Sequence, residues 1–160
     1  MDIFRMERSR GSIVKEFIKD QQKMTKYKKV FLIDDDEIHN FLCESVIRSQ
    51  QFAANVNSYL WAEEALECLN TIVKEKPHDF PEIIFLDINM PGMDGWEFIE
   101  EYRKLPVELT QNCLLFVLSS AVDKNDITHA KNLSEVNDFF SKPLTSDILN
   151  IISEQYSTHQ

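Results

Sequence analysis

From residue 28 onward, short apolar runs alternate with longer segments whose apolar residues recur at helical spacing. The short runs predict strands and the longer segments predict helices. Such an alternation is typical of an α/β domain built on a parallel sheet. The predicted strands span residues 29–34, 53–59, 82–87, 113–119 and 136–141. The predicted helices span residues 38–49, 61–74, 95–104, 124–133 and 145–156.

The first two predicted helices differ in the faces they present. The helix over 38–49 places four apolar residues on one face, Ile38, Phe41, Leu42 and Val46. The helix over 61–74 turns small and aliphatic residues inward, namely Ala62, Ala65, Leu66, Leu69 and Ile72. The solvated face of that helix is predicted to carry Glu63, Glu64 and Glu67. Residues 75–81 are predicted to form a loop, and residues 91–95 a turn with two glycines.

Four of the five predicted strands end on side chains that together could form a reactive site. Asp34 and Asp35 end the first, Asp87 the third, Ser119 the fourth and Lys142 follows the fifth. The carboxyl ends of parallel strands line one crevice, so these side chains are expected to share a pocket. Neighbouring carboxylates raise each other's pKa unless a cation intervenes, and oxygen ligands suit a hard ion such as Mg²⁺.

These residues, in this order, resemble the receiver domain of two-component response regulators, including the single-domain chemotaxis type. The resemblance covers residues 28–156 and rests on Asp34-Asp35, Asp87 with Met90-Pro91-Gly92-Met93-Asp94-Gly95, Ser119-Ser120-Ala121 and Lys142-Pro143. It implies a doubly wound α/β fold with a five-stranded parallel sheet in the flavodoxin-like order 2-1-3-4-5 and helices on both faces. Residues 1–27 would then be a basic extension, either disordered or a short helix, and residues 157–160 a tail.

The resemblance implies that Asp87 accepts a phosphoryl group from a phosphohistidine donor in a Mg²⁺-dependent reaction. Mg²⁺ would be held by Asp34, Asp35, Asp87 and the backbone carbonyl of Asn89. Asp36, which follows the acid pair, is expected at the start of the next helix, where a negative charge is favourable.

The resemblance also implies which residues respond to the phosphoryl group. Ser119 and Lys142 would contact its oxygens, and Ser119 would act with Phe139 as the switch. Many relatives have tyrosine where this chain has Phe139, so a switch based on ring packing survives and one that needs a phenol does not. The Lys142-Pro143 bond is often cis in the family.

The function implied is that of a stand-alone response regulator, a phosphoacceptor with intrinsic autophosphorylation and autodephosphorylation chemistry rather than an enzyme. Its partners would be a sensor histidine kinase or histidine phosphotransfer protein and a downstream target protein, with a homodimer as a further option. Two alternatives stay open: a non-phosphorylated receiver-like binding module, and an aspartate-nucleophile phosphatase. Those phosphatases usually carry the nucleophile and a second acid two residues apart on the first strand.

Charge and composition narrow the partners and the compartment. The net charge of -10 divides into +5 over residues 1–29 and -15 over the remainder. A body this acidic repels nucleic acid, so no nucleic-acid partner is expected. No run of 18 apolar residues occurs and charges interrupt the N-terminus, so we expect a cytoplasmic protein with no membrane partner.

Cysteine and histidine usage indicates neither disulfides nor a zinc site. An odd and scattered set of cysteines, Cys43, Cys68 and Cys113, is typical of small core residues. His39 lies one helical turn from Cys43, but the other histidines lie in unrelated segments.

The N-terminal segment has one feature of its own, a helical spacing of apolar residues after Ser12 made by Ile13, Val14, Phe17 and Ile18. The segment could be a basic amphipathic helix for a membrane surface or a partner. It could also be a frayed extension. A third option is that the given sequence starts upstream of the natural first residue, which would lie near Met24.

Overall fold

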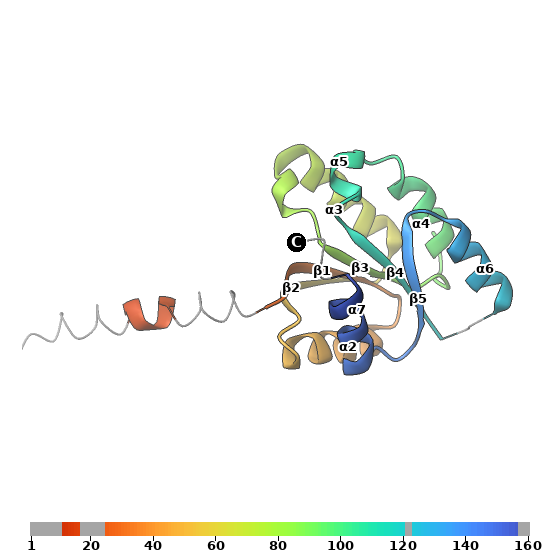
Figure 1. The fold of residues 1–160 in the computed structure, drawn as a ribbon. Coiled ribbons are helices and arrows are strands. Elements are labelled where there is room, and N and C mark those ends of the chain that lie inside the picture. Colours follow the sequence, from red (N-terminus) through yellow and green to blue (C-terminus); the bar gives the residue numbers. More distant parts are fainter. Residues whose placement is uncertain (1–10, 17–24, 121–122, 157–160) are drawn as a thin grey trace, which may run out of the picture.

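The computed structural model describes residues 11–16, 25–120 and 123–156 (Figure 1). Five parallel strands form one sheet in the order β2-β1-β3-β4-β5, which confirms both the predicted fold and the predicted strand order. The strands are β1 (Tyr27–Ile33), β2 (Ala53–Tyr59), β3 (Ile83–Leu86), β4 (Leu114–Ser119) and β5 (Val136–Ser141).

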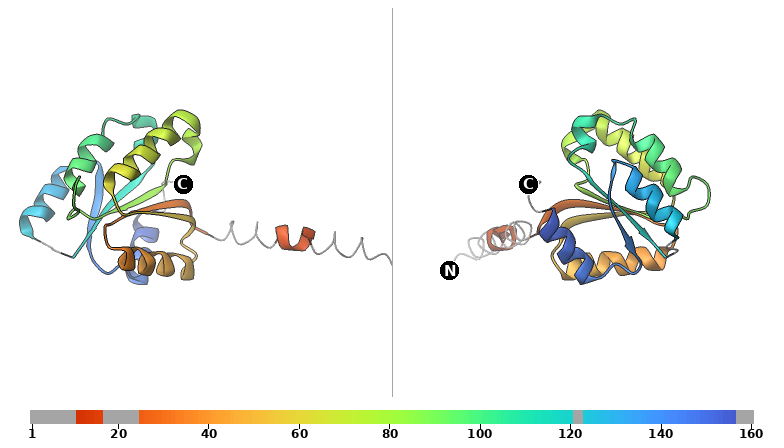
Figure 2. Two further views of the ribbon diagram at one scale, coloured as in Figure 1. Left: turned by 180° about the vertical axis from the view of Figure 1, so that it is seen from behind. Right: turned by 45° about the vertical axis from the view of Figure 1, so that its right-hand side comes forward.

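The helices lie on both faces of this sheet. They are α2 (Glu37–Ser49), α3 (Ala62–Glu75), α4 (Gly95–Tyr102), α5 (Val107–Thr110), α6 (Lys124–Asn132) and α7 (Ser146–Gln155). Helices α2 and α7 cover one face and α3 and α4 the other (Figures 1 and 2). Two short elements were not predicted: α5, and the 3₁₀ helix η1 (Pro77–Asp79) within the predicted loop. Each is a single turn, too short to show an apolar period.

The central strands are buried on both faces, which is why their sequences are continuous apolar runs rather than alternating ones. Every residue of β3 and β4 is buried. Two hydrophobic clusters lie on opposite sides of the sheet. One contains Phe31, Leu69 and Phe98, and the other contains Ile47 and Phe116. The strand ends that carry the candidate site therefore project from a rigid, fully packed layer.

Helix α2 does not bury the apolar face that its sequence suggests. Its buried residues are Asn40, Cys43 and Ile47. The predicted apolar face is largely in solvent, with residue exposures of 72% at Ile38, 68% at Phe41 and 53% at Leu42, while Val46 packs partly against the core. The helix is rotated so that polar Asn40 faces the sheet, and an apolar patch is left on the surface.

The N-terminal segment is described in part. Residues 11–16 are helical and exposed, including Ile13 and Val14, whereas Phe17 and Ile18 lie outside the described residues. Within the described ranges, no helix combines the length and apolar character that crossing a membrane requires. The cysteine prediction is confirmed for Cys43, Cys68 and Cys113, whose thiols are all free and which are buried or partly buried.

The start of α4 is packed tightly against the end of β3. Gly95, the first residue of α4, donates its N–H to the carbonyl of Ile88 at 3.1 Å. A Cβ at position 95 would lie 2.5 Å from Ile88 Cα and 2.8 Å from the carbonyl oxygen of Asp87. Glycine is therefore required by the close approach of two backbones.

We expect Gly95→Ala to lower the free energy of unfolding by about 1–3 kcal/mol, because the added methyl group must displace backbone rather than a flexible side chain. Urea denaturation measures this change. Gly11→Ala is the control, since a Cβ there meets no atom of the described residues within 4 Å. A Gly95→Ala protein as stable as the Gly11→Ala protein would contradict the role given to this contact.

Candidate functional site

The candidate site is assembled from the carboxyl ends of four strands. Asp34 and Asp87 are the first residues after β1 and β3, Ser119 ends β4 and Lys142 follows β5. The sheet ladder continues through these ends, because Asp87 N–H donates to the carbonyl of Ile33 at 2.9 Å and Lys142 N–H donates to that of Ser119 at 3.0 Å. Their backbone positions are thus set by strand pairing rather than by loop conformation.

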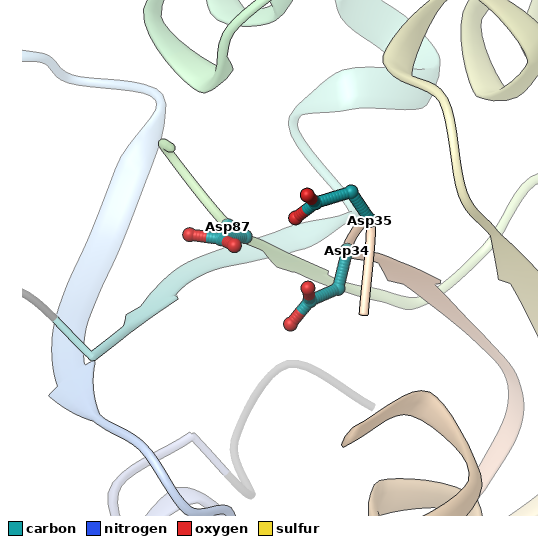
Figure 3. A group of neighbouring side chains, drawn as sticks. All are labelled: Asp34, Asp35 and Asp87. Carbon is teal, nitrogen blue, oxygen red and sulfur yellow. The ribbon is translucent and has the colours of Figure 1, made fainter. Parts of the chain in front are cut away.

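Three carboxylates meet at this edge of the sheet (Figure 3). Oxygen atoms of Asp34, Asp35 and Asp87 all lie within 4.8 Å of one another. Asp34 and Asp87 are only 4% and 5% exposed, whereas Asp35 is exposed. The expected clustering of these residues is therefore present, with two carboxylates taken out of water and one at the mouth of the site.

Lys142 joins the two buried carboxylates. Its ammonium lies 3.1 Å from Asp87 Oδ2 and also contacts Asp34 Oδ2. Burial by itself would lower the pKa of Lys142, but the hydrogen bonds to and charges of Asp34 and Asp87 raise it above its usual value. The side chain is therefore a fixed positive charge between two acids. The peptide bond between Lys142 and Pro143 is cis.

Opposing effects set the pKa of Asp87. Burial raises the pKa of its carboxyl group above the usual value, and the nearby charge of Asp34 acts in the same direction. The N–H of Asn89, which donates to Asp87 Oδ1 at 3.1 Å, and the ammonium of Lys142 oppose that rise. The net result is a raised pKa, so the ionised carboxylate is poorly compensated in this pocket.

The oxygen atoms that could act as metal ligands at this site suit Mg²⁺. Three carboxylates face one ammonium, so the cluster has an excess of negative charge, and carboxylate oxygens are the ligands that this hard cation prefers. The bond from Asn89 N–H to Asp87 also holds residue 89 beside the acids. Among the described residues, Asp34, Asp35 and Asp87 form the only group of three or more His, Cys, Asp or Glu side chains close enough to share an ion.

Ser119 ends β4 at the same edge of the sheet and is fully buried. Its hydroxyl has no hydrogen-bond partner among the described residues. A buried hydroxyl without a partner is uncommon, so it remains available to a group that enters the site. Phe139 is partly buried on β5 and pairs with Val117 of β4, two residues before Ser119.

Two residues of α2 belong to the site although their roles were not predicted. His39 Nδ1 lies 2.8 Å from Asp34 Oδ2, and the buried Asn40 side chain donates to the carbonyl of Asp34 at 2.9 Å. The predicted position of Asp36 is confirmed: it caps α2 by accepting from the N–H groups of Ile38 and His39. The sequence did offer a signal for these contacts. The predicted helix starts immediately after the acid run, so the first polar residues of α2 can face back toward the end of the strand.

Cys43 borders this region in surroundings that disfavour its thiolate form. Burial, assisted by the charge of Asp34, raises the pKa of its thiol to about 12. Its sulfur lies 3.6 Å from the ring nitrogens of His39. Together they make one wall of a small cavity beside Asp34 and Asp87.

Comparison with known proteins identifies the family. The family model of the response regulator receiver domain matches residues 30–153 of this chain. The chain belongs to the response regulator receiver family. A two-component response regulator from Cytophaga hutchinsonii, solved by crystallography, has 32% identity and a TM-score of 0.76, with 82% of this chain and 98% of that chain covered.

Curated relatives of this receiver domain include proteins of similar and of greater length. Sporulation initiation phosphotransferase F of Bacillus subtilis is 22% identical over 128 residues, which cover 80% of this chain and 92% of that protein. An uncharacterized response regulatory protein of Shewanella oneidensis is 28% identical over 142 residues, again covering 80% of this chain. The receiver domain spans 55% of the length of the Shewanella protein.

We expect Asp87→Asn to stabilise the metal-free receiver domain at neutral pH, because it removes a carboxylate whose ionisation is disfavoured by burial. The raised pKa of Asp87 means that the folded state binds its proton more tightly than the unfolded state does, so ionisation lowers stability as pH rises. The advantage of the variant should shrink as pH falls through that raised pKa, where the wild-type carboxyl group also becomes neutral.

Urea denaturation with a chelator present, at a series of pH values, measures this difference. Glu67→Gln removes the same charge from an exposed position on α3 and serves as the control. An Asp87→Asn protein that is less stable than wild type at neutral pH would show that the attraction of Lys142 outweighs the desolvation of Asp87.

Proposed function

We propose that this receiver domain is a single-domain response regulator of the cytoplasm that accepts a phosphoryl group on Asp87 from a phosphohistidine. The donor is a sensor histidine kinase or a histidine phosphotransfer protein. The observation that supports this most directly is the environment of Asp87, a buried carboxylate within 4.8 Å of two further acids and 3.1 Å from Lys142. Such a site is built to receive an anion together with a cation.

In the proposed reaction a carboxylate oxygen of Asp87 attacks the phosphorus of the donor. The P–N bond breaks, its electron pair returns to the imidazole of the donor, and an acyl phosphate forms on Asp87. Asp34, Asp35, Asp87 and the backbone carbonyl of Asn89 would hold Mg²⁺, which would neutralise charge on the phosphoryl oxygens. Lys142, already paired with Asp87 Oδ2, is positioned to donate to one of those oxygens.

The phosphatase alternative is disfavoured by what surrounds the candidate nucleophiles. Such enzymes carry a second acid two residues after the nucleophile, and the residue two after Asp87 is Asn89. Asp34 and Asp36 do have that spacing, but Asp36 is used as the N-cap of α2. We therefore propose a phosphoacceptor with intrinsic autophosphorylation and autodephosphorylation chemistry rather than an enzyme that turns over small substrates.

The proposed output is a change of binding surface around β4, α6 and β5. Phosphorylation adds about -1.5 to -2 charges and three acceptor oxygens near Ser119, whose hydroxyl bonds to no other residue that the structure describes. A shift of Ser119 would act on Phe139 across the β4–β5 ladder and on α6, which follows β4. Helix α6 buries one residue, Ala130, and stacks the ring of His129 on Trp96 of α4 at a centroid distance of 4.1 Å. A helix that buries only one of its residues completely can change position at small energetic cost.

Incubation with acetyl phosphate and Mg²⁺ should add one phosphoryl group to the wild-type protein, as measured by intact-protein mass. Asp87→Asn and a chelated wild-type sample should gain none, because each lacks one part of the proposed site. Failure of the wild type to gain mass under conditions that modify another receiver would favour the non-phosphorylated binding module. A gain in Asp87→Asn would assign the acceptor to another residue.

The donor protein is proposed to dock on the exposed apolar patch of α2 formed by Ile38, Phe41 and Leu42, which are 72%, 68% and 53% exposed. Helix α2 begins two residues after Asp35, so this patch lies beside the mouth of the site. A donor histidine must reach Asp87 for the P–N bond to be exchanged, and the protein that carries it must therefore cover this region. An apolar helical face on the donor would fit the patch.

Phe41→Glu should slow phosphoryl transfer from a phosphorylated histidine phosphotransfer protein at least tenfold, because it places a charge in the apolar contact. The rate with acetyl phosphate should stay within about twofold of wild type, since the small donor needs no docking surface. Val107→Glu is the control: Val107 is 64% exposed on α5, which precedes β4 and so lies at the opposite end of the sheet. Equal slowing by both variants, or slowing with both donors, would refute the docking proposal.

A further inference from the structure

We infer that Glu63 is a positioning residue, which holds the loop between β3 and α4 in the shape that presents the carbonyl of Asn89 to the metal. The inference rests on the proposed function, because it assumes the metal site proposed there. The sequence pattern places Glu63 on the solvated face of α3, and the side chain is indeed exposed. Its carboxylate nevertheless bonds to a loop that is 30 residues distant in the chain.

The loop is anchored near both ends by the two residues that directly follow β3. Asn89 N–H donates to Asp87 Oδ1 at 3.1 Å, and Gly95 N–H donates to the carbonyl of Ile88 at 3.1 Å. Between these anchors, Met93 N–H donates to Glu63 Oε1 at 2.9 Å. Glu63 therefore ties the loop to a second element, α3, between its two anchors.

The contact is close as well as directional. Gly92 has a φ of +72°, and a Cβ there would lie 2.8 Å from Glu63 Oε1 and 3.7 Å from the ring of Trp61. The carboxylate thus lies directly against the loop backbone. It is carried by the first turn of α3, which is anchored in the core by the fully buried Ala62 and Ala65.

A backbone carbonyl can serve as a metal ligand only where its loop places it. If the loop samples other shapes, metal binding must first select the competent one, and the apparent affinity falls by the fraction of competent molecules. Partners of this kind, one step removed from the ion, commonly change metal affinity. The effect should follow the hydrogen bond rather than the charge, because an exposed charge is screened by solvent and salt.

Four variants separate the hydrogen bond from the charge. Glu63→Ala removes both, and Glu63→Asp keeps the charge but withdraws the carboxylate by one methylene. Glu63→Gln removes the charge and keeps an acceptor oxygen. Glu64→Ala, at the exposed neighbouring position, is the control for loss of an acidic residue from the same turn.

An NMR titration with Mg²⁺ measures affinity from the amide shifts of residues 87–95, and hydrogen exchange of the Met93 amide reports the bond itself. We expect Glu63→Ala and Glu63→Asp to weaken Mg²⁺ binding roughly threefold to tenfold and to speed exchange at Met93. Glu63→Gln and Glu64→Ala should stay within about twofold of wild type in both measurements. A merely structural role would lower thermal stability without changing the Mg²⁺ affinity of the folded protein.

Two results would overturn the inference alone: unchanged Mg²⁺ affinity in Glu63→Ala and Glu63→Asp despite faster exchange at Met93, or equal weakening in Glu63→Gln and Glu63→Ala. The first would show that the loop needs no tie to α3, and the second that charge is what matters. A wild-type protein that binds no Mg²⁺ would overturn the metal site of the proposed function, and this inference with it.

Discussion

The burial of two carboxylates beside a single ammonium is the constraint on which the rest of this structure depends. Asp34 and Asp87 are almost completely removed from water, and Lys142 contacts both. One positive charge cannot compensate two buried acids and the exposed Asp35, so the site keeps an excess of negative charge. Burial, together with the charge of Asp34, raises the pKa of Asp87. The excess negative charge creates a place for a hard cation and, with it, a phosphoryl group.

The surrounding fold holds this unfavourable arrangement in place. Strands β3 and β4 are buried on both faces, and their hydrogen bonding continues into Asp87 and to Ser119. Asn40 secures the carbonyl of Asp34 from α2, while Gly95 lets α4 begin in contact with the end of β3. The packing free energy of the core therefore maintains a local charge cluster that would be unstable alone.

Two surfaces with different packing adjoin the site. The patch of Ile38, Phe41 and Leu42 lies on a firmly packed helix, since α2 buries Cys43 and Ile47 in the core. Helix α6 packs along β5 but buries only Ala130 completely, and the ring of its His129 stacks on Trp96. A rigid apolar patch suits recognition of a donor, and a lightly attached helix suits a response to phosphorylation. The proposed docking surface for the donor and the proposed response to phosphorylation therefore use regions of different local stability.

Sequence by itself determined the fold and the identity of the clustered residues. Strands β2 and β5 have the predicted bounds. The apolar pattern of a strand is formed by residues that are close together in the chain, so it can be recognised from the sequence. Asp34, Asp87, Ser119 and Lys142 could be assigned to one pocket because parallel strands all end at the same edge. The one-turn elements η1 and α5 escaped prediction, since a single turn has no period to detect.

Tertiary structure alone decided which face of α2 is used and which distant groups meet. The apolar face of α2 is exposed because Asn40 must reach the carbonyl of Asp34, a requirement that hydrophobic period does not encode. His39 joins the acids, and Glu63 bonds to Met93, through contacts set by how the helices sit on the sheet. Periodicity reports the average environment of a segment, whereas a hydrogen bond depends on the positions of two particular atoms, which only the packed chain defines.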